Sequence, residues 1–171
     1  MRALLSVPLL GSLFLVLLLD QISKVWVLRS IAPHSIIEVV PGCFNFTLTF
    51  NSGIAFGMFS SMNSPWRELL IGGAVLTALV TVLFFHVRYY KNDRIAQLAI
   101  GAVLGGALGN VLDRFRIGQV VDFLDFYIGS SHWPAFNIAD SAVCLGVFLL
   151  LLRPVHEEHN PDERDDAAAV E

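Results

Sequence analysis

Long runs of apolar residues, separated by shorter polar segments, dominate the pattern of this chain. Four runs, at 3–19, 69–87, 95–112 and 135–152, are 17 to 19 residues long. A helix needs about 20 mainly apolar residues to cross the hydrocarbon core of a bilayer. The pattern therefore predicts four transmembrane helices. No small-residue cleavage site follows the first run, so we interpret it as a retained helix and not as a secretory signal.

The segment 30–66, between the first two runs, has a different period. Apolar and polar side chains alternate from Phe44 to Asn51, and this period of two is typical of a β-strand with two unlike faces. We expect a small sheet on the membrane surface. Two interpretations stay open for it: a platform that receives an acyl chain and an extended peptide, or a cap with a small core of its own.

The third run carries Gly101, Gly105 and Gly109 at four-residue spacing. Glycines repeated in this way leave one face of a helix without side chains, which allows a neighbouring helix to approach closely. We interpret them as a packing feature with no chemistry of their own.

Composition also indicates a membrane protein. Of the 171 residues, 55% are hydrophobic and only 15% are charged, and the mean hydropathy is +0.65. A soluble domain of this length would need more charge to cover its surface. We predict one multi-pass membrane domain at 1–155. It is followed by an acidic tail at 156–171, which has no apolar period and is expected to be disordered and cytoplasmic.

The positions of lysine and arginine predict the orientation in the membrane. The segment 30–66 contains neither residue, whereas the link between the second and third runs contains Arg88, Lys91 and Arg94. Cytoplasmic loops are enriched in these residues. The link and both termini are therefore predicted to be cytoplasmic, with 30–66 and 113–134 on the outer face.

Polar residues gather at one predicted membrane level, near the outer face. Ionisable side chains at or inside a span are costly in hydrocarbon, which makes them candidates for function. The polar residues at this level are Asp20 at the end of the first run, Asn110, Asp113 and Arg114 at the end of the third, Asp122 in the outer loop that follows, and Asn137 and Asp140 at the start of the fourth.

Asp122 and Asp140 carry the most chemical information. Asp140 is the sixth residue of its run, about 8 Å from the outer end of a helix. Asp122 is flanked by apolar residues, so its carboxyl group is a candidate for a raised pKa. A pair that shares one proton can hydrolyse a peptide, because the ionised group takes a proton from water while the protonated group donates one to the scissile carbonyl. Proton-coupled carriers also keep carboxylates in the membrane, so the pair alone does not decide between the two classes.

The neighbouring polar residues have structural interpretations as well. Asp20 and Lys24 have the i, i+4 spacing of a helical ion pair. The sequence Asn-Ser-Gly at 51–53 is typical of a turn that closes a strand. Three residues of the third helix share one face, either as packing polarity or as a shell that orients the aspartate pair: Asn110, Asp113 and Arg114. A serine or cysteine mechanism is not favoured, because Ser141 and Cys144 have no base at helical spacing.

Taken together, five blocks of the chain resemble, in order and spacing, the signature blocks of the lipoprotein signal peptidases (signal peptidase II). The blocks are Asp20-Gln-Ile-Ser-Lys24, Asn51-Ser-Gly-Ile-Ala-Phe56, Gly105-Gly-Ala-Leu-Gly-Asn-Val-Leu-Asp-Arg114, Val120-Val-Asp-Phe123 and Phe136-Asn-Ile-Ala-Asp-Ser141. The resemblance covers almost the whole chain except the tail. It implies four transmembrane helices, an outer β-cradle and a short periplasmic helix, which we place at 58–66.

The resemblance also implies an activity and a set of site residues. Members of this family are aspartyl endopeptidases of the bacterial inner membrane that cut diacylglyceryl-modified prolipoproteins just before the lipid-modified cysteine. Asp122 and Asp140 then correspond to the catalytic pair. The residues that correspond to the lining or support of the site are Asp20, Lys24, Asn51, Gly53, Asn110, Asp113, Arg114 and Asn137. We expect membrane phospholipid around a monomer, with no metal, cofactor or nucleic acid.

Two other classes of function remain as alternatives. In a small proton- or ion-coupled carrier, Asp20, Asp122 and Asp140 would form a relay. In a non-enzymatic assembly subunit, the glycine face would hold a complex together, and replacing the aspartates would leave function intact.

Overall fold

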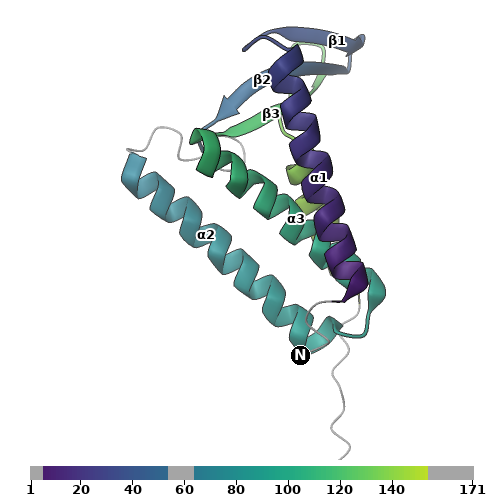
Figure 1. Ribbon diagram of the computed structural model, residues 1–171. Coiled ribbons are helices and arrows are strands. Elements are labelled where there is room, and N and C mark those ends of the chain that lie inside the picture. Colours follow the sequence, from purple (N-terminus) through teal and green to yellow (C-terminus); the bar gives the residue numbers. More distant parts are fainter. Residues whose placement is uncertain (1–5, 54–63, 154–171) are drawn as a thin grey trace, which may run out of the picture.

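The computed structural model describes residues 6–53 and 64–153, which form four α-helices and a small antiparallel sheet (Figure 1). The elements are α1 (Val7–Ser30), β1 (Ile36–Val40), β2 (Phe44–Asn51), α2 (Ser64–Phe85), the π-helical turn η2 (His86–Tyr90), α3 (Arg94–Ile117), β3 (Val120–Ile128), β4 (Ser131–His132) and α4 (Ile138–Leu151). The predicted fold class, mainly α with a small sheet, is confirmed. The acidic tail and most of the proposed helix at 58–66 lie outside the described residues, and 64–66 begin α2.

Three helices within the described residues are long and apolar enough to cross a membrane: α1, α2 continued by η2, and α3. The shorter α4 has 14 residues, so the predicted run 135–152 is helical only from Ile138. The reason is a capping box at the preceding residue. The Asn137 side chain accepts the Asp140 N–H at 3.0 Å, and the Asp140 side chain accepts the Asn137 N–H at 3.2 Å.

Two helices are longer than their apolar runs. In α1 the polar block at 20–24 does not end the helix, because Asp20 and Lys24 lie one turn apart and pair with each other on its buried face. α3 continues past residue 112 and stops at Gly118. That glycine has a φ of +73°, a left-handed conformation that favours glycine, and its N–H bonds to the carbonyl of Arg114.

The strands lie in the order β1-β2-β3-β4, and every neighbouring pair is antiparallel. β2 is the alternating strand that the sequence predicts. Its pairing with β3 sets Thr49 opposite Asp122 and Asn51 opposite Val120. Asp122, which the sequence places in the segment that follows the third helix, lies in a strand of that segment and not in a loop, because β3 completes its backbone hydrogen bonds with β2.

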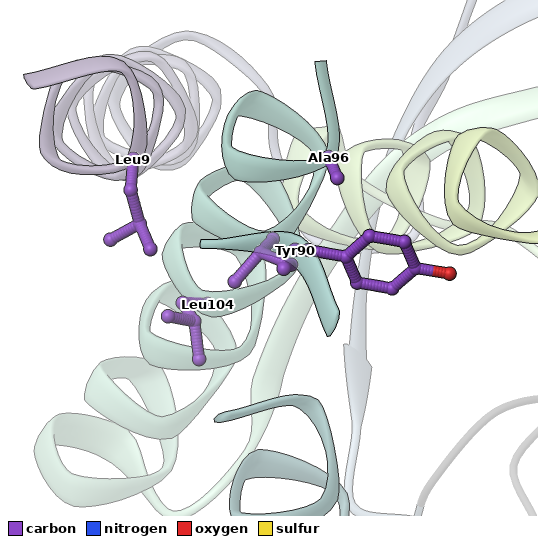
Figure 2. Packing of buried hydrophobic residues seen from close by; sticks show 5 residues of the cluster. Leu9, Tyr90, Ala96 and Leu104 are labelled. Carbon is purple, nitrogen blue, oxygen red and sulfur yellow. The ribbon is translucent and has the colours of Figure 1, made fainter. Parts of the chain in front are cut away.

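Two small apolar cores hold these elements. One fastens the sheet to the C-terminal end of α1 and consists of Val27, Ile31, Leu48, Val121 and Phe123. The other lies at the opposite end of the helices (Figure 2) and consists of Leu9, Tyr90, Ala96, Ile100 and Leu104. The start of α1 and the end of α4 thus lie at the same end of the molecule, away from the sheet.

Glycines let α3 approach both α1 and α4, as their spacing predicts. A Cβ on Gly105 would lie 2.5 Å from the carbonyl oxygen of Leu13 in α1. A Cβ on Gly106 would lie 2.5 Å from the carbonyl oxygen of Ala139 in α4. These backbone contacts leave no room for a side chain, and they bring polar residues of three helices close together at the sheet end.

Candidate active site

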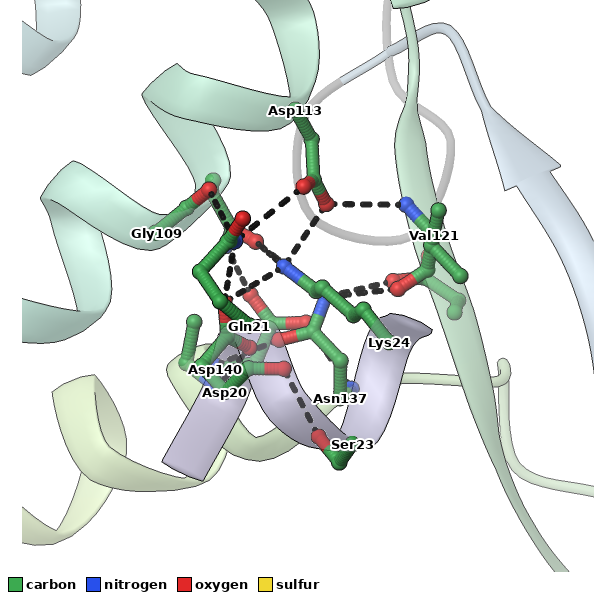
Figure 3. Close-up of polar contacts among 12 residues, drawn as sticks. Asp20, Gln21, Ser23, Lys24, Gly109, Asp113, Val121, Asn137 and Asp140 are labelled. Atoms are coloured by element: carbon green, nitrogen blue, oxygen red, sulfur yellow. Dashed lines mark hydrogen bonds and ion pairs between the residues drawn. The ribbon is translucent and has the colours of Figure 1, made fainter. Parts of the chain in front are cut away.

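Polar residues from five elements meet where the sheet-side ends of the helices reach β2 and β3 (Figure 3). The structure brings together all ten residues that the sequence singles out, joined by a continuous set of hydrogen bonds and ion pairs. They are Asp20 and Lys24 of α1, Asn51 of β2 and Gly53 after it, Asn110, Asp113 and Arg114 of α3, Asp122 of β3, and Asn137 and Asp140 at the start of α4.

Asn137 connects the two candidate catalytic carboxylates. Its side-chain nitrogen Nδ2 donates to Asp122 Oδ1 at 2.8 Å. Its side-chain oxygen accepts the backbone N–H of Asp140 at 3.0 Å, so one residue both caps α4 and holds Asp122. Asn137 is completely buried, which excludes competing water from these bonds. The geometry therefore fixes Asp122 relative to the first turn of α4.

Asn110 approaches the pair from α3. Its Nδ2 donates to Asp140 Oδ1 at 2.8 Å, and its Oδ1 accepts hydrogen bonds from Lys24 at 3.0 Å and from Asn137 at 3.2 Å. Each carboxylate thus receives a hydrogen bond from a neutral amide group. An amide donor adds no net charge. It can therefore orient a carboxyl group without favouring the ionised form as strongly as a cation does.

Asp122 lies in the environment that favours a protonated carboxyl group. Its side chain is buried, and Asn51 donates to its Oδ2 at 3.1 Å. Burial, followed by the negative charge of Asp140, raises the pKa of Asp122 to about 7, against the hydrogen bonds from Asn51 and Asn137. Near neutral pH this carboxyl group can hold a proton, as its apolar flanks suggest.

Asp140 lies closer to the end of its helix than counting along the apolar run predicts. It is the third residue of α4 and not the sixth of a continuous helix, because the three residues before Ile138 are not helical. Its position at the helix N-terminus favours a negative charge. The two carboxyl groups of the pair therefore lie in different surroundings, one in a strand and one at the start of a helix.

A buried lysine, Lys24, forms ion pairs with two further carboxylates next to the aspartate pair, those of Asp20 and Asp113. Lys24 Nζ lies 2.9 Å from Asp20 Oδ2 and 2.8 Å from Asp113 Oδ2. Lys24 is 2% exposed and Asp20 is fully buried, so the helical ion pair that the spacing predicts lies in the protein interior. Asp20 Oδ1 also accepts the N–H of Ala139 at 3.0 Å, and the absent side chain of Gly109 provides the space for the carboxylate.

Gln21 belongs to this network, and the sequence analysis missed it. Its Nε2 donates to Asp20 Oδ2 at 3.1 Å, to Asp113 Oδ1 at 3.2 Å and to the carbonyl of Gly109 at 3.3 Å. The signal that could have identified it is its place inside the block 20–24, next to an intramembrane aspartate. A neutral glutamine in a helix otherwise attracts no attention, because it carries no charge to be balanced.

Arg114 fixes the segment that follows β2. Its guanidinium donates to the carbonyl of Gly53 at 2.7 Å and to the carbonyl of Asn110 at 3.2 Å. The Gly53 N–H in turn donates to the Asn51 side-chain oxygen at 2.9 Å, which is the turn that the sequence predicts. Arg114 thereby connects α3 to the residue that holds Asp122.

The aspartate pair opens on a cavity of about 560 Å³. Asp122 and Asp140 form part of its wall, and most of the remaining wall is apolar. The apolar residues come from α2, α3, α4 and the segment before α4, among them Ile71, Val75, Leu79, Val103, Val143 and Phe136. A cavity of this kind suits an apolar chain whose reactive group reaches two carboxyl groups. Within the described residues, no group of three His, Cys, Asp or Glu is placed to hold a metal ion.

Comparison with known proteins gives a consistent result. The family model for signal peptidase (SPase) II matches residues 12–155. A lipoprotein signal peptidase of Syntrophus aciditrophicus is 40% identical over 144 residues, covering 84% of this chain and 89% of the relative. One of Burkholderia thailandensis is 41% identical over 147 residues, covering 84% and 85%. A solved structure of a bacterial membrane enzyme, determined in meso at 1.9 Å, is 30% identical with a TM-score of 0.71, covering 84% of this chain and 90% of the other.

Proposed function

The chain belongs to the signal peptidase II family and acts as a lipoprotein signal peptidase, and on this basis we propose a substrate, a bond and a mechanism. The substrate is a prolipoprotein whose cysteine already carries a diacylglyceryl group. The bond is the peptide bond just before that cysteine. The mechanism is hydrolysis by Asp122 and Asp140 without a covalent intermediate. The single observation that carries the mechanism is the position of Asn137 between the two carboxylates, since its side-chain amide donates to Asp122 Oδ1 and its backbone N–H donates to Asp140 Oδ2.

In this mechanism Asp122 holds the shared proton and Asp140 is ionised. Asp140 takes a proton from water as the water oxygen attacks the scissile carbonyl carbon, and Asp122 donates its proton to the carbonyl oxygen. The tetrahedral diol then collapses. The C–N bond breaks, the proton on Asp140 passes to the leaving cysteine nitrogen, and one diol hydroxyl returns its proton to Asp122. The raised pKa of Asp122 supports this assignment of the proton.

The cavity supports the choice of substrate. Its apolar wall is suited to the hydrophobic part of a signal peptide or to an acyl chain, and the carboxyl pair lies at its polar end. A diacyl anchor confines the scissile bond to one depth of the membrane, so that positioning replaces a search in three dimensions. The platform interpretation of the sheet gains support from β2, since Asn51 and Thr49 both bond to Asp122.

The charge distribution supports an orientation for this multi-pass protein. Arg88, Lys91 and Arg94 lie at the end of the helices opposite the sheet, whereas 30–66 contains no lysine or arginine. We place the former end in the cytoplasm and the sheet and site at the outer face of the inner membrane. Both termini are then cytoplasmic. We propose that the domain 1–155 works as a monomer surrounded by phospholipid, with the tail 156–171 in the cytoplasm.

The test is conversion of a diacylglyceryl-modified prolipoprotein by the purified protein in detergent, followed as a shift on a gel. We expect conversion by the wild type, no change with a chelator, and loss of conversion in Asp140→Asn. Asp93→Asn is the matched control, since asparagine keeps the helix cap of α3 far from the site. Conversion retained in Asp140→Asn would overturn the dyad. No conversion by any form would overturn the substrate, and proton flux in vesicles would then test the carrier.

A further inference from the structure

A second cavity, of about 470 Å³, lies at the end of the helices away from the sheet. It is formed by η2, the link to α3, the first residues of α3 and Arg153 after α4. Its volume falls within the range of small-molecule sites, about 300–1,000 Å³. No part of the peptidase mechanism uses it. We call it the basic cavity, after four cationic residues of its wall: Arg88, Lys91, Arg94 and Arg153.

The wall of the basic cavity has an excess of positive charge. Asp93 is its only acidic lining residue among those described. That carboxylate is already engaged, since it accepts hydrogen bonds from Arg153 at 2.8 Å and from the N–H groups of Ile95 and Ala96 at 2.9 and 3.1 Å. Four cations face one anion, and a concave surface with this balance selects an anionic ligand.

The surroundings of the basic cavity are apolar. Phe85 and Val87 on one side and Ile95 and Leu98 on the other are exposed large side chains at its rim or within one turn of it along the chain. Tyr89 and Tyr90 lie between them in the wall, and tyrosine is enriched where membrane helices meet water. A ligand that fits both features has an anionic head and long apolar chains. The acidic tail at 156–171 has anionic groups but no long apolar chain.

We propose that the basic cavity binds the phosphate of an anionic phospholipid headgroup, with the acyl chains along the exposed apolar side chains of η2 and α3. Arginine suits this role because its planar guanidinium makes paired hydrogen bonds to phosphate oxygens. Arg88 and Arg94 are exposed, with the Arg88 guanidinium 5.4 Å from the centre of the Tyr89 ring, and Lys91 adds a point charge. In the orientation proposed above, this lipid belongs to the inner leaflet.

The test is thermal unfolding of the full chain in neutral detergent during titration with phosphatidylglycerol. The same titration is made with phosphatidylcholine of equal chain length and with inorganic phosphate. A ligand that binds the folded state raises the midpoint. We expect a saturable rise with phosphatidylglycerol only, with its half-saturation at roughly tenfold higher lipid in Arg88→Gln/Arg94→Gln. Arg29→Gln is the matched control, because that exposed arginine lies at the sheet end of α1.

Each contrary outcome has a defined meaning. An equal rise with inorganic phosphate would overturn the lipid in favour of the free ion. An equal rise with phosphatidylcholine, or an unchanged titration in Arg88→Gln/Arg94→Gln, would show that the acyl chains act without the cavity. If the double variant does not fold, Lys91→Gln tests the same wall. No response in the wild type would overturn the proposal and leave the acidic tail as the candidate anion.

Discussion

Asn137 Nδ2 lies 2.8 Å from Asp122 Oδ1, so the residue that caps α4 also holds one of the two proposed catalytic carboxylates. The cap and the carboxylate contact use different atoms of the same side chain. The cap uses the oxygen, and the carboxylate contact uses the nitrogen. The two contributions can therefore be separated by substitution.

Asn137→Ser is expected to keep the helix cap and to lose the amide donor. Serine is as good a cap as asparagine, so Asn137→Ser should lose only the stability that the buried amide contributes through its bonds to Asp122, Asn110 and Val121. Prolipoprotein conversion should fall by about tenfold to a hundredfold, because this hydrogen bond stabilises the charge that develops on Asp122 as its proton passes to the carbonyl oxygen. Asn137→Ala, which removes both, should lose stability by about 1 kcal/mol as well. Equal conversion by Asn137→Ser and the wild type would show that this amide donor has no role in hydrolysis.

The rate of conversion is expected to fall as the pH rises through about 7, where Asp122 loses its proton. Asn51 donates to the Asp122 carboxylate and favours its ionised form. Asn51→Ala should therefore raise the pKa of Asp122 and move the alkaline limb of the kcat/KM profile to higher pH. Thr49→Val is the control, because Thr49 bonds only to the backbone carbonyl of Asp122. A limb that moves to lower pH in Asn51→Ala would contradict the assignment.

Lys24→Met is expected to be strongly destabilising. It leaves Asp20 and Asp113 buried without their cation, a situation that costs about 3–5 kcal/mol. Adding Asp113→Asn should recover part of the loss, because one of the two unpaired charges is then removed. Arg29→Met, on the exposed side of the same helix, should change the unfolding free energy by less than about 0.5 kcal/mol. Similar thermal midpoints for Lys24→Met and Arg29→Met would rule out a structural ion-pair centre.

Gly105→Ala is expected to separate α1 from α3. The new methyl group would lie 2.5 Å from the carbonyl oxygen of Leu13, and backbone cannot move aside as a flexible side chain can. We expect a loss of about 1–3 kcal/mol in thermal unfolding experiments. Gly73→Ala in α2 meets nothing within 4 Å and should be neutral or stabilising by up to about 1 kcal/mol. A harmless Gly105→Ala would mean that the two helices pack less closely than described.

The membrane helices and the alternating strand could be predicted from the sequence, because each depends on a local period. The residues at which these helices begin and end could not be predicted in this way. The start of α4 depends on the capping box of Asn137 and Asp140, and the apolar run hides it by extending to residue 135. The end of α1 lies beyond Asp20 because a lysine one turn later pairs with it, a contact that apolar length does not report.

The residues of the candidate site were easier to predict from the sequence than the contacts between them. Asp20, Asp113, Asp122 and Asp140 stand out because charge in an apolar setting is costly. Gln21 has no such signal, although it bonds to two of these carboxylates. The strand position of Asp122 was also hidden, since β3 becomes a strand only through pairing with β2, about 70 residues earlier in the chain.

The hydrogen bond from Ala139 N–H to Asp20 Oδ1 joins residues 119 positions apart in the sequence. Asp20 lies in α1 and Ala139 lies in α4, so this bond joins the first and the last of the described helices. The proposed catalytic pair therefore reaches this geometry only after α4 has packed against α1 and α3. A chain without α4 lacks Asp140 and the partner of Asp20 Oδ1, so it would hold neither the proposed catalytic pair nor the contact that ties α1 to α4.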